Sequence, residues 1–236
     1  MPNHYFQFKE FKVEQDKCAM KVCTDSCLFG AWVTIDDSVN SVLDIGAGTG
    51  LLSLMLAQKT NAKIDGIEID ENAFEQASEN FEHSIWKDRL TALSGDVKTF
   101  PFTQKYDFIV CNPPFYEREF ASNSEEEKVA KHSLHLTLPY LLTAIKNLLN
   151  ADAKFAILLP YYRKDEFEKL AAEHHFYPEK TICIKQSNAH EYFRYAGIFS
   201  STKSIHIQEE FIAIKTNHLH YSTEAIALLK PYYLYL

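Results

Sequence analysis

The turn Gly46-Ala47-Gly48-Thr49-Gly50 is the feature that most restricts how this 236-residue chain can fold. It joins a short apolar run, residues 41–45, to a segment of helix-forming residues, 51–59. Glycine lets the backbone turn sharply and approach a ligand without a clash of Cβ atoms. An apolar strand that ends in glycines and leads into a helix is typical of the ligand-binding turn of a doubly wound α/β sheet.

Apolar runs and helix-forming segments alternate along most of the chain. The expected helices are residues 51–59, 71–82, 138–149 and 163–175. The expected strands are residues 41–45, 63–69, 90–94, 106–111, 153–159, 181–186 and 211–216, and residues 194–200 are a candidate for a further strand. This alternation predicts an α/β fold with a Rossmann-like, seven-stranded, mostly parallel sheet and helices on both of its faces.

Residues suited to ligand binding follow four of the expected strands at the point where each strand ends. The glycine turn follows the first, Glu68 ends the second, Asp96 follows the third and Asn112 follows the fourth. Ligands of doubly wound sheets bind outside the carboxyl ends of the strands. We therefore expect these four features to meet at one edge of the sheet and to form one site.

The spacing of the glycines distinguishes between two kinds of nucleotide-like ligand. A dinucleotide turn reads G-x-G-x-x-G, whereas this turn reads G-x-G-x-G and is preceded by Asp44. A carboxylate there would repel a diphosphate but suits the ammonium group of a methionine moiety, directly or through water. Glu68, or its rival Asp70, can accept from ribose hydroxyls, and Asp96 can accept from an adenine amino group. These residues predict S-adenosylmethionine as cofactor, against the alternative of a ligand-free turn.

The turn Asn112-Pro113-Pro114-Phe115 indicates the chemistry for which the cofactor is used. Two prolines fix φ and remove two N–H donors, which stiffens the turn and leaves acceptors facing the pocket. The Asn112 side-chain oxygen and the Pro113 carbonyl can each accept one N–H of an exocyclic amine. Phe115 can stack on a planar ring, and Tyr116 can add a second contact. The turn predicts direct methyl transfer to nitrogen without a metal, against the alternative of a rigid loop with no catalytic role.

Composition and cysteine usage are those of a globular protein. The chain is 46% hydrophobic and 24% charged, has no apolar run of membrane-spanning length, and lacks a signal-peptide core at its N-terminus, so we expect a cytoplasmic location. Its five cysteines are odd in number and form no C-x-x-C pair, which argues against a disulfide framework or a zinc site.

The polar segment Tyr116–Leu136 is long for a compact domain, so we expect a functional lid or disorder there.

The charge distribution argues against a uniformly basic nucleic-acid binder. The net charge is −8, and all of it falls in residues 1–150, because residues 151–236 carry ten basic and ten acidic side chains. Any contact with RNA would have to use local clusters, and ordinary solvated charges are the alternative reading of them. The candidate clusters are Lys9, Lys12, Lys17 and Lys21 on one side, and Arg163, Lys164 and Arg194 on the other.

Both turns together support a family resemblance. Asp44–Gly50 with Asn112–Phe115 resembles the class I S-adenosylmethionine-dependent methyltransferases that act on exocyclic or amide nitrogen, which include adenine-N6, cytosine-N4 and protein-glutamine enzymes. The N-terminal stretch Phe8–Val22 with Thr24-Asp25, and the ending Ile226–Leu236, look like the bacterial tRNA(Val) adenine-N6-methyltransferase family. Members of that family modify the adenine just 3′ of the anticodon. The resemblance covers almost the whole chain.

The resemblance implies roles for individual residues. Cofactor contacts would come from Lys21, Thr24, Asp25, Asp44, Gly46, Gly48, Gly50, Glu68, Asp96 and Asn112. The target base would be held by Asn112, Pro113 and Phe115, with further substrate contacts from Pro114, Tyr116 and Arg194. Residues 1–35 would form a cap over the cofactor site and residues 36–236 the methyltransferase domain of a monomer that acts on tRNA. The alternatives are a protein glutamine N5-methyltransferase, an rRNA adenine or guanine N-methyltransferase, and a non-catalytic cofactor-binding module.

Overall fold

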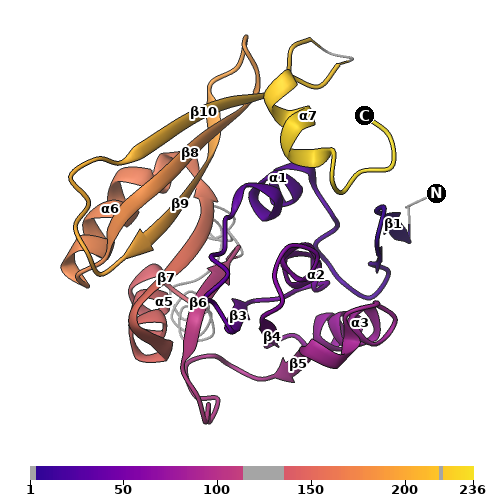
Figure 1. The fold of residues 1–236 in the computed structure, drawn as a ribbon, viewed down its shortest axis with the longest axis vertical. Coiled ribbons are helices and arrows are strands. Elements are labelled where there is room, and N and C mark those ends of the chain that lie inside the picture. Colours follow the sequence, from indigo (N-terminus) through magenta and orange to yellow (C-terminus); the bar gives the residue numbers. More distant parts are fainter. Residues whose placement is uncertain (1–3, 114–135, 218–219) are drawn as a thin grey trace, which may run out of the picture.

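An eight-stranded sheet crosses the molecule in the order β10-β8-β9-β7-β6-β3-β4-β5 (Figure 1). The computed structural model describes residues 4–113, 136–217 and 220–236, so the expectation of a lid or disorder over Tyr116–Leu136 falls almost wholly outside the described residues. The strands of this sheet are β3 (Ser41–Ile45), β4 (Lys63–Glu68), β5 (Leu90–Ser94), β6 (Tyr106–Cys111), β7 (Leu149–Pro160), β8 (Tyr177–Ser187), β9 (Tyr192–Ser200) and β10 (Gln208–Lys215).

The predicted mostly parallel sheet is confirmed, but the predicted number of seven strands is wrong. The segment near 194–200 is a full strand, β9, which pairs antiparallel with both β7 and β8. The remaining pairs of the sheet are parallel. A short connection can join antiparallel neighbours, and residues 188–191 make such a connection between β8 and β9.

Helices cover both faces of the sheet, as predicted (Figure 1). The sheet separates two hydrophobic cores. The helices are α1 (Thr24–Trp32), α2 (Leu51–Ala57), α3 (Glu71–Glu82), α5 (Leu138–Leu148), α6 (Lys164–Glu173) and α7 (Thr223–Leu229), with short 3₁₀ turns η1 (Lys87–Arg89) and η3 (Tyr161–Arg163). α1, α2, α3 and α7 pack in one core, and α5 and α6 pack in the other. Neighbouring residues of β3 alternate between them: Val42 faces the first and Leu43 the second.

The register of the central strands sets the position of the site. Ile45 at the end of β3 lies opposite both Ile67 in β4 and Cys111 at the end of β6. Gly46, directly after β3, and Asn112, directly after β6, therefore leave the same edge of the sheet side by side. The carboxyl ends of the parallel strands thus meet where the sequence predicted a ligand site.

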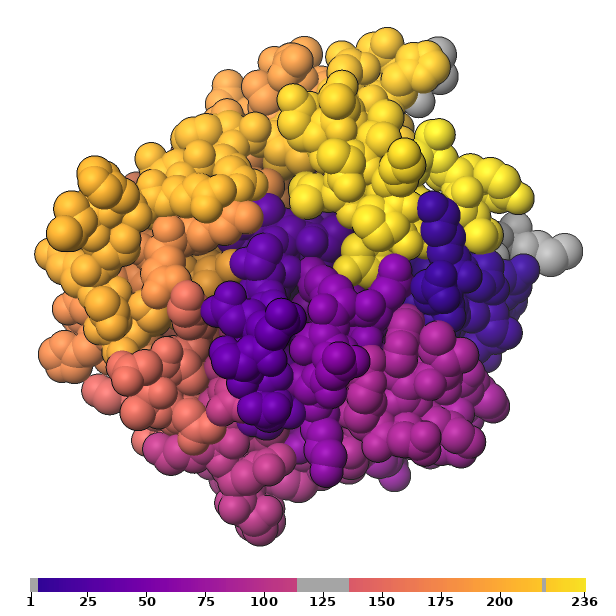
Figure 2. Space-filling view, viewed as in Figure 1, coloured from indigo at the N-terminus to yellow at the C-terminus, as the bar shows by residue number. Residues whose placement is uncertain are grey.

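The two ends of the chain pack against each other. An antiparallel ribbon of β1 (Tyr5–Gln7) and β2 (Lys12–Glu14) precedes α1. The ring of Phe8 stacks on Phe11 at 4.5 Å and contacts Tyr233 at 5.9 Å. Lys9 donates to the Lys230 carbonyl at 2.6 Å. Figure 2 shows the first and last segments side by side on one surface.

Within the described residues, no helix combines the length and the apolar character needed to cross a membrane.

Candidate active site

A pocket of about 240 Å³ lies at the carboxyl edge of the sheet, where the central strands end. Five of the predicted site residues line it: Gly46, Gly48, Glu68, Asp96 and Asn112. They come from four separate strand ends and lie up to 66 positions apart in the sequence. The structure therefore brings together the features that the sequence placed after β3, β4, β5 and β6.

The glycine turn contributes backbone that is open toward this pocket. Gly46 and Gly48 have φ angles of 73° and 56°, which side chains rarely adopt, and a Cβ built on either would meet no described heavy atom within 4 Å. Gly50 differs, because a Cβ there would lie 2.5 Å from a ring carbon of Phe81. Gly46 and Gly48 thus leave room for a ligand, whereas Gly50 leaves room for α3 to pack on the turn.

Glu68, at the end of β4, is held by the backbone around it. Its Oε2 accepts from the Gly48 N–H at 2.9 Å, and its Oε1 accepts from the N–H groups of Ile69 and Asp70 at 2.9 and 3.0 Å. A carboxylate offers about four acceptor positions, so one position on Oε2 remains for a ligand. Asp70 also lines the pocket, with one oxygen capping α3 through the Ala73 N–H at 2.9 Å.

Asp96 follows β5 and borders the pocket from the next strand. Its Oδ1 accepts from the Lys98 N–H at 2.9 Å, and its Oδ2 forms an ion pair with the Lys98 ammonium at 3.2 Å. The carboxylate is therefore fixed in place, with acceptor positions left on both oxygens.

Asp44 lies beneath the turn rather than in the pocket lining. Its side chain is fully buried, and its Oδ2 accepts from the N–H and the hydroxyl of Ser53 in α2 at 3.1 and 2.8 Å. Its Oδ1 is buried without a hydrogen-bond partner among the described residues. Burial raises the pKa of this carboxyl to about 7. Asp44 thus anchors α2 to β3 and keeps one acceptor for a cation or a proton.

The three site residues predicted around α1 lie outside the pocket lining. Lys21 donates to the Gln15 carbonyl, and Thr24 begins α1. Asp25 forms a 2.6 Å ion pair with Arg194 of β9. Asp25, predicted to bind the cofactor, and Arg194, predicted to bind the substrate, therefore contact each other.

Asn112 leaves β6 at the wall of the pocket. Its Nδ2 donates to the Ser26 hydroxyl of α1 at 2.9 Å. Its Oδ1 is buried and has no hydrogen-bond partner within the part of the chain that the structure describes. Pro113 is buried behind it, and the predicted site residues Pro114, Phe115 and Tyr116 lie outside the described residues. An enclosed amide oxygen without a donor costs about 1–3 kcal/mol, so this atom calls for an N–H partner.

Sequence reasoning expected residues 1–35 to form a cap over the cofactor site, but it named none of the cap residues that line this pocket and missed one residue at a strand end. Cys18, Ala19 and Met20 line it, as does Ile69, whose residue is 60% exposed. Ile69 carried a usable signal, because it is an apolar residue between two carboxylates at a strand end. Residues 18–20 belong to the expected cap but could not be singled out within it, since their position depends on α3.

Two buried amides of α3 hold the N-terminal segment beside the turn. Asn80 accepts from the Glu14 N–H at 2.9 Å and donates to the carbonyls of Glu14 and Thr49 at 2.8 Å each. Gln76 accepts from the Lys17 N–H at 3.0 Å. Both side chains are at most 2% exposed. The segment that leads to residues 18–20 is therefore tied to α3 and, through Thr49, to the glycine turn.

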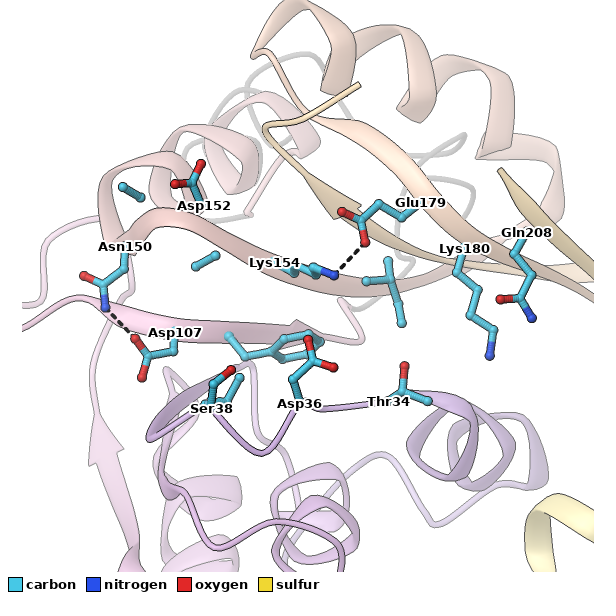
Figure 3. Close-up of a pocket in the computed structure, with 15 residues that line it drawn as sticks. Thr34, Asp36, Ser38, Asp107, Asn150, Asp152, Lys154, Glu179, Lys180 and Gln208 are labelled. Carbon is cyan, nitrogen blue, oxygen red and sulfur yellow. Dashed lines mark hydrogen bonds and ion pairs between the residues drawn. The ribbon is translucent and has the colours of Figure 1, made fainter. Parts of the chain in front are cut away.

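A larger hollow, of about 390 Å³, lies at the opposite edge of the sheet (Figure 3). Two of its charged groups have partners in the protein: Lys154 pairs with Glu179 at 2.8 Å, and Asp107 accepts from the Asn150 amide at 2.8 Å. Burial alone would raise the pKa of Asp107, but its hydrogen-bond donors hold that pKa below the usual range. The smaller pocket, with the unpaired Oδ1 of Asn112 at its wall, is the better candidate for chemistry.

The fold and this pocket define a class, the class I S-adenosylmethionine-dependent methyltransferases. Residues 31–137 match the family model described as Methyltransferase small domain. Two solved structures share the fold. A predicted O-methyltransferase, Atu636 from Agrobacterium tumefaciens, superposes with a TM-score of 0.65 at 13% identity over 87% of this chain and 95% of its own. The glycopeptide N-methyltransferase MtfA, complexed with S-adenosylmethionine, gives 0.55 at 11% identity over 76% and 87%.

Comparison with curated sequences gives the narrower assignment. A protein from Flavobacterium psychrophilum named tRNA1(Val) (adenine(37)-N6)-methyltransferase is 43% identical over 97% of this chain and 99% of its own length. A protein of the same name from Dyadobacter fermentans is 39% identical over 98% of both chains. The chain belongs to the tRNA1(Val) (adenine(37)-N6)-methyltransferase family.

Proposed function

We propose that this enzyme transfers a methyl group from S-adenosylmethionine to the N6 atom of adenine 37 in tRNA1(Val). The observation that carries the proposal is the buried Asn112 Oδ1, which lacks a donor among the described residues and stands at the wall of the pocket. An exocyclic amine supplies the N–H that this oxygen lacks. The names and the full-length similarity of the relatives support adenine 37 as the source of that amine.

The hydrogen-bond acceptors in and beneath the pocket fit S-adenosylmethionine. Open space beside Gly46 and Gly48 admits the ligand against the backbone. The remaining acceptor on Glu68, with Asp70, suits the ribose hydroxyls, and Asp96 suits the adenine amino group. The orphan Oδ1 of Asp44 suits the ammonium group through a bridging water. When bound, the cofactor supplies a methyl group on a sulfonium, which is a good leaving group.

The residues at the end of β6 prepare the acceptor. Asn112 Oδ1 and the Pro113 carbonyl each accept a hydrogen bond from one N–H of the amine. The lone pair of the nitrogen is then directed away from the ring and toward the methyl donor. Phe115 stacks on the base in this proposal, on sequence grounds. Hydrogen bonding by two acceptors also increases electron density on a weakly nucleophilic nitrogen. The amine becomes acidic once it is alkylated, so its proton leaves to water and no strong base is needed.

The N-terminal segment completes the cofactor site in this proposal. Residues 18–20 line the pocket, which supports treating residues 1–35 as a cap over it and residues 36–236 as the catalytic domain. The cap also contributes to the main hydrophobic core, since its residues Phe8, Phe11 and Val13 are buried there. Cap and catalytic domain therefore fold together.

Charge pairing within the protein leaves few basic side chains to bind RNA phosphates. Lys12 pairs with Glu14, Lys17 with Glu75 and Glu79, and Arg163 with Glu166. The basic clusters singled out in the sequence are thus largely neutralised within the protein. Adenine 37 lies in a single-stranded loop, where a base can be turned out at little cost and held by stacking and hydrogen bonds. Base contacts therefore supply more of the affinity than phosphate contacts do.

The test is the destination of a labelled methyl group. The enzyme is incubated with methyl-labelled S-adenosylmethionine and, in separate reactions, with unmodified tRNA1(Val), the same tRNA with guanine at position 37, ribosomal RNA, and a protein extract. We expect label in the first tRNA alone, recovered as N6-methyladenosine after digestion. Label in glutamine would assign the protein N5-methyltransferase activity, and label in ribosomal RNA would assign that alternative.

A further inference from the structure

The side-chain amide of Asn112 works in one orientation. Its two ends have nearly the same shape, but one accepts hydrogen bonds and the other donates them. If Nδ2 faced the substrate, two N–H groups would oppose each other and the amine would not be held. The terminal torsion of asparagine is broad and roughly two-fold, so the residue does not set this orientation itself. A neighbouring group has to fix it.

Ser26 of α1 is placed to do so. Its hydroxyl lies 2.9 Å from Asn112 Nδ2, although the two residues are 86 positions apart. Ser26 is 5% exposed, so water has little access to compete for the amide. On the basis of the proposed function, we propose that Ser26 is a positioning residue, whose hydroxyl accepts from Asn112 Nδ2 and thereby presents Oδ1 to the acceptor amine.

The surroundings of the hydroxyl favour its use as an acceptor. A serine hydroxyl has one hydrogen to donate and two acceptor positions. The Cys23 sulfur lies 3.0 Å from Ser26 Oγ and can take that hydrogen, which leaves the acceptor positions for the amide. Burial raises the pKa of the Cys23 thiol, so it stays neutral and adds no charge beside the amide.

α1 is held firmly enough to serve as a reference point. Asp25, next to Ser26, is tied to β9 by its ion pair with Arg194. Leu28 and Phe29, on the following turn, are fully buried in the core. Because the helix is fixed at both points, the hydroxyl cannot retreat, and the Asn112 amide aligns to it.

The test compares Ser26→Ala and Ser26→Thr with a matched control, Ser84→Ala. Ser84 is likewise nearly buried, and its hydroxyl donates to the Phe81 carbonyl at 2.8 Å and accepts from the Trp86 N–H at 3.2 Å. Turnover is measured with saturating tRNA and cofactor, and cofactor affinity by calorimetry. Ser26→Ala should lower kcat by about 10- to 100-fold with cofactor Kd within about twofold, because a displaced catalytic group loses alignment. Ser26→Thr keeps the hydroxyl and should recover most of the turnover.

Two results would overturn the assignment: wild-type turnover in Ser26→Ala, or an equal loss in Ser26→Ala and Ser84→Ala. An equal loss in folded Ser26→Ala and Ser26→Thr would also overturn it, because packing rather than the hydroxyl would then matter. Failure of the proposed substrate looks different. Wild-type enzyme would then label another amine acceptor, and the Ser26 comparison would be repeated on that acceptor with the same criteria.

Discussion

The two edges of the sheet carry hollows that differ in their unpaired atoms. At the carboxyl edge, Asn112 and Asp44 each keep a buried oxygen without a partner among the described residues, in or beneath a pocket of about 240 Å³. At the amino edge, a hollow of about 390 Å³ has Lys154 paired with Glu179 and Asp107 held by the Asn150 amide. Volume would favour the second. Unsatisfied hydrogen-bonding capacity favours the first, and this capacity is the better guide to chemistry.

Replacing the amide at each edge gives the largest expected contrast. Asn112→Ala should lower kcat by about 10³-fold or more, because it removes an acceptor used in the transition state. Its cofactor Kd should stay within about threefold of the wild type. Asn150→Ala removes the amide that donates to Asp107 at the amino edge and should leave turnover unchanged. Turnover of Asn112→Ala within tenfold of the wild type would rule out the proposed catalytic role.

Asp107→Ala should have its effect on folding rather than on turnover. The carboxylate accepts from the N–H groups of Asn40 and Ser41 at 3.0 Å each, from the Ser41 hydroxyl, and from Asn150. Losing it should reduce the free energy of unfolding by about 3 kcal/mol. Urea titration measures this loss, and methylation assayed on the folded variant is the control. A catalytic defect without a loss of stability would contradict the contrast between the edges.

The glycine turn allows the same contrast within a few residues. Gly48→Ala places a Cβ in open space, so it should weaken cofactor binding about tenfold and cost about 1 kcal/mol of stability for the left-handed backbone. Gly50→Ala drives a Cβ into Phe81 and should cost about 3 kcal/mol of stability. Calorimetry and urea titration separate the two quantities. Equal effects of the two substitutions would show that the turn has no distinct ligand-facing glycine.

The smallest effect concerns pH. The pKa of Asp44 is raised to about 7, so its share of stability is present at low pH and is lost as the pH rises toward 7. The cofactor ammonium favours the ionised carboxylate, so cofactor affinity should rise about three- to tenfold from pH 6 to pH 8. Asp44→Asn should abolish this rise. Asp107 has the opposite sign, because its pKa is lowered and its contribution disappears only as the solution becomes acidic.

Periodicity and strand ends predicted the architecture and the edge that carries the site. Glu68, Asp96 and Asn112 could be placed because each follows an apolar run, and parallel strands align their carboxyl ends. The antiparallel insertion of β9 could not be foreseen, since strand order depends on packing between distant segments. The ribbon β1–β2 and helix α7 were also missed. Their apolar faces are short, and both are buried in the same core by contacts between distant segments.

Individual contacts were less predictable than positions. Gly48 and Gly50 look alike in the sequence, and a ring from α3 distinguishes them. Asp25 and Arg194 were expected to bind different ligands, yet they neutralise each other across 169 positions. The contact of Ser26 with Asn112 had no signal in the sequence, because a serine at a helix start has many uses. Each of these outcomes depends on a single long-range contact, which local patterns do not encode.

The meeting of Phe8 with Tyr233 has a consequence for how the enzyme becomes active. During synthesis, the N-terminal residues leave the ribosome long before the C-terminal ones. The ring of Tyr233, against which the N-terminal segment packs, is therefore missing until residue 233 has been synthesised. Nascent or C-terminally shortened chains would fold their central strands but would lack an ordered N-terminal wall of the cofactor pocket. The ability to methylate should therefore appear only once the C-terminal residues have been added.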